Sequence, residues 1–132
     1  MKYFCLTFAA LLIGQSAFAA DCVDPQTQQE MNACAAQEYQ KADGQLNATY
    51  QQMLTRASEK QRELLTVAQR AWLQVRDADC KFVSSGAEGG SAQSLAWNQC
   101  LADKTRDRNA FLTSLSQCDE GDLSCPLPPS GN

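Results

Sequence analysis

Regular spacing of apolar side chains over residues 27–56 is the feature that most restricts how this chain can fold. Apolar residues recur there every three or four positions, which places them on one face of a helix. Thr27 and Glu30 have the spacing of a capping box, in which each side chain binds the other residue's backbone amide. The pattern predicts a helix from Thr27 to about Arg56, roughly 45 Å long. Its apolar positions are Met31, Ala35, Tyr39, Ala42, Leu46, Tyr50 and Met53.

Two more helices are predicted to follow. Ser58 and Gln61 form a second capping-box pattern, so the turn lies near residues 57–58 and makes the first two helices antiparallel neighbours. The second helix is expected to end at residues 84–86, with Gly86 in the left-handed conformation. Its predicted inward residues are Leu64, Leu65, Ala68, Trp72, Val75 and Phe82.

The third helix is predicted to begin near Ser91 or Ser94. Its apolar residues are Leu95, Trp97, Cys100, Leu101, Leu112 and Leu115. Three amphipathic helices with short connections predict an all-α fold, an antiparallel three-helix bundle in up-down-up order, stapled by disulfides.

Residues 1–19 have the features of a secretory signal peptide. Lys2 supplies the positive start, an apolar run follows, and residues 17–19 offer a small-x-small cleavage site. The run is too short to span a bilayer, so no membrane anchor is expected after cleavage near Ala19. We therefore expect a periplasmic or secreted protein. It would consist of a helical domain over residues 20–117 and, over 118–132, a disulfide-closed acidic loop with a flexible tail.

Six cysteines remain once Cys5 leaves with the signal peptide. Six cysteines in an exported domain predict three disulfides, with 15 possible pairings. The up-down-up order places Cys22, Cys34, Cys80 and Cys100 near one end of the bundle, and Cys118 and Cys125 near the other. The last two should pair with each other. For the first four, the shortest loops favour Cys22–Cys34 with Cys80–Cys100, while Cys22–Cys80 with Cys34–Cys100 remains open.

The sequence offers no recognisable catalytic set. It contains no histidine, no CxxC spacing and no glycine-rich phosphate loop, so no enzyme activity, metal site or cofactor is expected. Asp77 and Asp79 are two residues apart on a helix and point in different directions, so they cannot flank one bond as a glycosidase pair does. The net charge of −4 argues against nucleic acid as a partner and is compatible with a basic protein.

Residues 69–80 (QRAWLQVRDADC) place an indole, two guanidiniums and a carboxylate on about three helical turns. One interpretation is a bundle core in which the arginines lie along apolar neighbours and bind carboxylates, with Asp43 of the first helix reaching Arg76. The other is that these residues also contact a partner. The residues concerned are Gln69, Arg70, Trp72, Arg76 and Asp77.

Two loops are candidate contact surfaces. The loop at residues 85–90 carries Glu88 as its one charge, and it is either a probe that enters a partner's cleft or a plain connector. Asp119, Glu120 and Asp122 form either a solvated acidic loop, a surface for a basic partner or a weak cation site, although they lack EF-hand spacing. The two loops are expected at opposite ends of the bundle.

The run AQRAWL at residues 68–73, followed by Arg76-Asp77-x-x-Cys80, resembles the LprI-like family of small exported helical domains. The segment Thr27–Tyr50, with its Asn32-x-Cys34 and Ala42-Asp43 motifs, is similar to the same family. The resemblance covers residues 22–115. It implies an exported lysozyme inhibitor that acts by non-covalent binding. Of the two loops, the one with Glu88 is the favoured contact, because it is expected near the disulfide-braced end of the bundle and could enter a cleft. The alternative is a periplasmic helical interaction module for envelope upkeep, which binds another periplasmic protein and not lysozyme.

Overall fold

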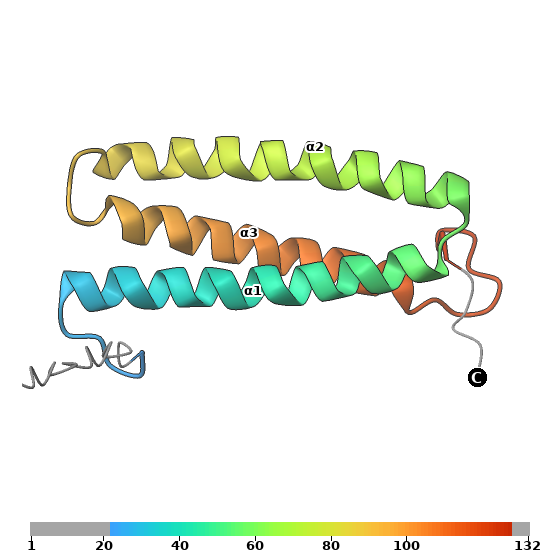
Figure 1. Cartoon of the computed structure of the whole chain (residues 1–132), viewed down its shortest axis with the longest axis horizontal. Coiled ribbons are helices and arrows are strands. Elements are labelled where there is room, and N and C mark those ends of the chain that lie inside the picture. Colours follow the sequence, from blue (N-terminus) through green and yellow to red (C-terminus); the bar gives the residue numbers. More distant parts are fainter. Residues whose placement is uncertain (1–21, 128–132) are drawn as a thin grey trace, which may run out of the picture.

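Three long helices form the body of the protein, which a computed structural model describes over residues 22–127. They are α1 (Gln28–Arg56), α2 (Glu59–Ser84) and α3 (Gln93–Ser116), with a short 3₁₀ helix η1 (Ser85–Ala87) in the connection between α2 and α3. Figure 1 shows α1 and α3 running in one direction and α2 in the opposite direction. The predicted all-α antiparallel bundle is confirmed, and the described residues contain no strand. The predicted signal peptide and residues 128–132 lie outside the described residues.

Both predicted capping boxes are present, and they set where α1 and α2 begin. The Glu30 amide donates to the Thr27 hydroxyl at 3.1 Å, and the Thr27 amide donates to the Glu30 carboxylate at 3.0 Å. Ser58 and Gln61 make the equivalent pair of bonds at 3.3 and 3.0 Å. Each box satisfies backbone amides that have no partner within the helix, which is why these starting points could be read from local sequence.

The three pairs of helices differ in how closely they pack. α3 lies along α1 over most of its length, whereas α2 approaches α3 at fewer positions. α1 and α2 are linked mainly by long side chains: Arg62 Nε donates to the Leu54 carbonyl at 2.8 Å, and the Tyr50 and Thr66 hydroxyls lie 3.2 Å apart. The first two helices are antiparallel, as predicted, but they pack less closely than α1 and α3 do. A short turn makes two helices antiparallel, but it does not determine how closely they pack.

The apolar core lies toward the end of the bundle that carries the α1–α2 turn. Leu46, Met53, Ala57 and Leu112 are buried there together with Leu127, which is only 5% exposed. Leu127 comes after α3, so the chain folds back and covers this end of the bundle. The segment up to Leu127 thus packs on the helices.

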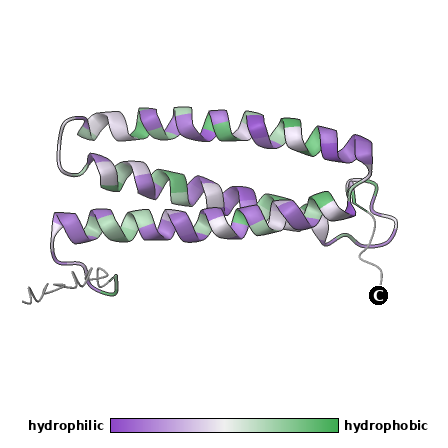
Figure 2. Cartoon of the chain, in the orientation of Figure 1, coloured by the Kyte–Doolittle hydropathy of each residue, from purple (hydrophilic) through white to green (hydrophobic). Residues whose placement is uncertain are grey.

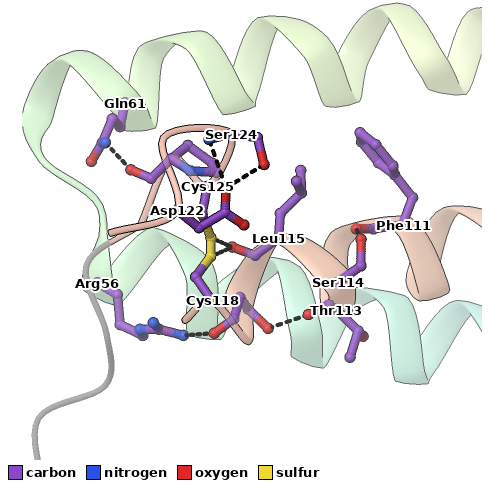
Figure 3. Close-up of a disulfide and its surroundings, with 12 residues drawn as sticks. Arg56, Gln61, Phe111, Thr113, Ser114, Leu115, Cys118, Asp122, Ser124 and Cys125 are labelled. Carbon is purple, nitrogen blue, oxygen red and sulfur yellow. Dashed lines mark hydrogen bonds between the residues drawn. A yellow bond between two sulfur atoms is a disulfide. The ribbon is translucent and has the colours of Figure 1, made fainter. Parts of the chain in front are cut away.

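Three disulfides staple the two ends. Cys22–Cys34 and Cys80–Cys100 have Cα–Cα distances of 5.4 and 5.5 Å and lie toward the end with η1. Cys118–Cys125, with a Cα–Cα distance of 5.8 Å, closes the loop at the opposite end (Figure 3). Of the alternatives that the sequence left open, the structure contains the pairing with the shortest loops.

The rotation of α2 about its own axis differs from the predicted one. Leu64, Val75 and Phe82 were expected inward but are 61%, 58% and 82% exposed, and Ala68 is exposed as well. The face that α2 turns toward the bundle instead buries Gln69, Arg76, Cys80 and Ser84. The Cys80–Cys100 bond and the contacts of Arg76 hold this face inward, so hydrophobicity alone pointed about 120° away from it at 100° per residue.

The end of α2 also differs in detail. The helix ends at Ser84 as predicted, but it continues into η1, and Gly86 does not adopt the left-handed conformation. Gly89 has the positive φ, at 76°. The Glu88 amide donates to the Ser85 carbonyl at 3.2 Å, which tightens the chain before it reverses at Gly89.

Candidate binding site

Arg76 is the most extensively bonded side chain of the bundle interior. Only 6% of the residue is exposed. Its Nε and Nη2 donate to Asp77 Oδ1 at 2.9 and 2.8 Å, and its Nη1 donates to the buried Thr105 hydroxyl at 3.4 Å. Nη1 also lies 3.8 Å from Asp43 Oδ1, so the predicted ion pair between the first two helices is present.

Aromatic rings enclose the same guanidinium. Its carbon lies 5.4 Å from the ring centroid of Tyr39 and 5.2 Å from that of Trp72, within the range of a cation–π interaction. With carboxylates, a hydroxyl and two rings around it, Arg76 has little capacity left for a ligand. The core interpretation therefore accounts for Trp72, Arg76, Asp77 and Asp43.

The two other residues of this sequence motif have different surroundings. Gln69 is buried and its Oε1 accepts a hydrogen bond from Arg108 Nε at 3.0 Å. Arg70 is exposed, and within residues 22–127 it has no ion pair. Two consecutive positions of α2 thus hold a buried glutamine and an exposed guanidinium that is available to solvent or a partner.

Arg108 of α3 is a candidate that the motif on α2 did not indicate. Its guanidinium lies 5.6 Å from the ring centroid of Trp72 and 5.3 Å from that of Phe111. Burial lowers the pKa of Arg108, and no carboxylate of the described residues lies within ion-pair distance. Arg108 belongs to a segment of alternating charge, residues 103–108, yet its guanidinium points toward Gln69 and Trp72 of α2.

A groove runs between α2 and α3, and Arg108 and Phe111 line both of its hollows. The first hollow has a volume of about 290 Å³ and is almost entirely apolar. It extends to Leu127 of the segment that follows α3, residues 117–127, which we call the closing segment. The second has a volume of about 320 Å³ and contains the Asp79–Lys104 ion pair at 2.6 Å. We call these two hollows together the α2–α3 groove. Its apolar lining includes Leu64, Ala68, Val75 and Leu115.

Glu88 lies in the connection between α2 and α3, at the end of the bundle. It is exposed, while its neighbours are held: the Gly89 amide donates to Gln93 Oε1 at 3.2 Å, and Asn32 Nδ2 donates to the Ser91 carbonyl at 2.9 Å. Cys80 precedes this loop in sequence and Cys100 follows it, and the two form a disulfide. The loop that carries Glu88 is thus tied both to α1 and to α3.

The acidic loop lies at the opposite end, next to the Cys118–Cys125 bond (Figure 3). Asp119, Glu120 and Asp122 are all exposed. The Ser124 hydroxyl and amide donate to Asp122 Oδ1 at 2.6 and 2.9 Å, and these bonds lower the pKa of Asp122. Asp122 therefore helps to hold the conformation of the loop. Among residues 22–127, no three possible metal ligands come together.

The closing segment binds α2 and packs on the core, beside a bond between the ends of α1 and α3. Gln61 of α2 donates to the Pro126 carbonyl, and Arg56 of α1 donates to the Ser116 carbonyl at the end of α3 at 2.9 Å (Figure 3). The structure thus keeps the acidic loop and the Glu88 loop at opposite ends of the bundle. They are two separate candidate surfaces, with the α2–α3 groove between them.

Comparison with known proteins identifies the family. The family model described as "Lysozyme inhibitor LprI" matches residues 19–112. The chain belongs to the LprI family. The uncharacterized protein R02472 of Rhizobium meliloti (strain 1021) is 34% identical over 113 residues, which are 76% of this chain and 81% of that protein.

A solved structure supports the same relationship. The crystal structure of a DUF1311 family protein from Pseudomonas putida KT2440 is similar with a TM-score of 0.62 at 32% identity. The similarity covers 67% of this chain and 92% of that one. The LprI-family resemblance read from the motifs on α1 and α2 is thereby confirmed. Among the described residues, no helix has the length and hydropathy needed to cross a membrane.

Proposed function

We propose that this protein is an exported lysozyme inhibitor that acts by non-covalent binding. The observation that carries the proposal is the match of residues 19–112 to the family described as a lysozyme inhibitor. The disulfides support an oxidising compartment such as the periplasm or the extracellular space. The acidic net charge of −4 would speed encounter with a basic enzyme.

We further propose Glu88 as the main contact. It is the one exposed carboxylate of a short loop that is bonded on both sides, through Gln93 and through Asn32 to Ser91. A loop held in this way loses little conformational entropy when it enters a cleft, so more of the contact energy goes into affinity. At the other end, Asp122 already accepts two bonds from Ser124, which leaves it less suited to a partner.

A peptidoglycan lysis assay tests this function directly. The purified, oxidised protein is added at micromolar concentration to animal-type, goose-type and bacterial muramidases. We expect lysis to slow with at least one of them. If Glu88 is the contact, Glu88→Gln should weaken inhibition about tenfold, equivalent to about 1.4 kcal/mol of binding free energy.

Glu120→Gln is the matched control, because it removes the same charge from an exposed carboxylate at the opposite end of the bundle. It should leave inhibition unchanged. Undiminished lysis with all three enzyme classes would contradict the inhibitor proposal. Full potency of Glu88→Gln together with a loss for Glu120→Gln would instead move the contact to the acidic loop.

A further inference from the structure

The first hollow of the α2–α3 groove has a single charged residue in its lining, Arg108. Every other residue of that lining is apolar except Gln61, whose side-chain amide already donates to the Pro126 carbonyl. Hydrophobic positions recur between hydrophilic ones along α2 and α3 (Figure 2), and Figure 3 shows Phe111 and Leu115 pointing from α3 toward α2. The hollow is thus apolar, with one cation where it meets the second hollow.

The guanidinium of Arg108 has hydrogen-bond donors that the bundle does not use. Its Nε donates to Gln69 Oε1, whereas Nη1 and Nη2 make no hydrogen bond or ion pair among residues 22–127. The rings of Trp72 and Phe111 lie beside it, and burial lowers the pKa of Arg108. A guanidinium that loses hydration without gaining a carboxylate favours a ligand that supplies one.

The other charges of the groove favour a ligand with one negative charge. In the second hollow Asp79 is bound to Lys104, and Arg76 has the partners described above. Asp107 lines the same hollow and has no ion pair among the described residues. A carboxylate matches the one unpaired guanidinium in charge and in its planar pair of acceptors. A phosphate monoester, with about two negative charges, would also be repelled by Asp107.

We propose that the α2–α3 groove binds a medium-chain fatty acid, with its carboxylate on Nη1 and Nη2 of Arg108 and its acyl chain in the first hollow. A volume of about 290 Å³ is at the lower end of small-molecule pockets, which suits one short chain. A peptide with a free carboxyl end fits less well, because it would bury amide groups for which this lining has no free partner. The binding is independent of the proposed inhibition through Glu88.

Isothermal titration calorimetry of the full, oxidised protein with sodium decanoate, below its critical micelle concentration, tests the site. We expect binding with a Kd of about 10–100 μM, as is usual for a ligand of this size. Decyltrimethylammonium has the same tail and a positive head, so it should bind at least about tenfold more weakly. N-acetyl-leucyl-leucine, which has a free carboxyl end on a peptide, should give no measurable binding at the same concentrations.

Two substitutions separate the charge from the apolar hollow. Arg108→Gln should raise the Kd for decanoate at least about tenfold. Arg70→Gln is its matched control, because it removes the same charge from an exposed arginine of α2 outside the groove lining, and it should leave the Kd unchanged. Ala68→Trp fills the first hollow and should abolish binding, whereas Ala71→Trp, at an exposed alanine outside that lining, should not.

Circular dichroism verifies that each variant keeps its helical fold. A wild type that does not bind decanoate would overturn the proposal, as would an Ala68→Trp variant that binds it with unchanged Kd. Equal binding of decanoate and decyltrimethylammonium, or an unchanged Kd for Arg108→Gln, would overturn the role of Arg108. Binding of the peptide in place of decanoate would overturn the acyl chain as the occupant of the first hollow.

Discussion

Arg76 shows how a single charged residue can organise the interior of a small helical protein. Its guanidinium connects all three helices, through Asp43 and Tyr39 of α1, Trp72 and Asp77 of its own helix, and Thr105 of α3. A buried charge is stable only when hydrogen bonds and opposite charges surround it. Arg108 has fewer partners of the same kinds. Its guanidinium binds the Gln69 amide oxygen and lies near the rings of Trp72 and Phe111, and it has no ion pair among residues 22–127.

Removing the Arg76 side chain should therefore destabilise the protein strongly. We expect Arg76→Ala to lower the free energy of unfolding by about 3 kcal/mol, because Thr105 loses its partner and the space between Tyr39 and Trp72 is left unfilled. Arg76→Lys should recover only part of the loss, since an ammonium cannot bind in the same fork geometry. Urea unfolding, followed by tryptophan fluorescence, measures the change.

Lys41→Ala is a suitable control, because Lys41 is exposed on α1 and has no ion pair among the described residues. It should change the free energy of unfolding by no more than about 0.5 kcal/mol. Equal effects of the two alanine variants would show that the Arg76 contacts contribute no net stability.

At the scale of the elements, the helix starts and the helix faces are determined differently. Each start depends on a side chain and an amide three residues apart, as at Thr27 and at Ser58. The face that a helix buries depends on what lies beside it. For α2 that is Cys100 and Thr105 of α3, and their contacts turn polar residues inward and leave Leu64, Val75 and Phe82 outside.

The cap of α2 is open to a direct test. Ser58→Ala removes the acceptor for the Gln61 amide and should lower the free energy of unfolding by about 1 kcal/mol. Ser114→Ala serves as the control, because that exposed hydroxyl bonds only a carbonyl within its own helix, 2.6 Å away. Thermal unfolding by circular dichroism compares them. A melting temperature for Ser58→Ala equal to that of Ser114→Ala would argue that the cap is dispensable.

At the scale of the whole molecule, the protein is a bundle with a small apolar core and disulfides at both ends. The cluster of Leu46, Met53, Ala57, Leu112 and Leu127 lies toward one end, while the other end holds Cys22–Cys34 and Cys80–Cys100 and buries mostly small apolar residues beside Leu101. Small domains with few buried apolar residues depend on such covalent links. The same bonds stiffen the end of the bundle from which the proposed Glu88 contact projects.

The pairing and its contribution can be measured together. Peptide mapping without reduction should recover Cys22–Cys34, Cys80–Cys100 and Cys118–Cys125 as linked peptides, with no free thiol. Loss of one bond should lower the free energy of unfolding by about 2–4 kcal/mol. Recovery of a Cys34–Cys100 peptide would contradict the structure, and so would unchanged stability after full reduction.

The sequence by itself determined the helices, their antiparallel order and the family, because these depend on short-range signals. A capping box and an apolar repeat act within a few residues, where backbone hydrogen bonding decides the conformation. A family motif such as AQRAW is likewise a short continuous run. The order of the helices also placed four cysteines at one end and Cys118 with Cys125 at the other, but only the tertiary structure decided how the four pair.

Only the tertiary structure decided which helices are closest, which face α2 buries and where the end of the described chain packs. These outcomes depend on contacts between residues far apart in sequence: Cys80 with Cys100, Arg76 with Thr105, and Leu127 with Leu46. On α2 the apolar repeat is a valid helix signal, yet it belongs to a face that the bundle leaves exposed. The pattern identifies a surface that favours burial, and the fold decides whether the chain covers it.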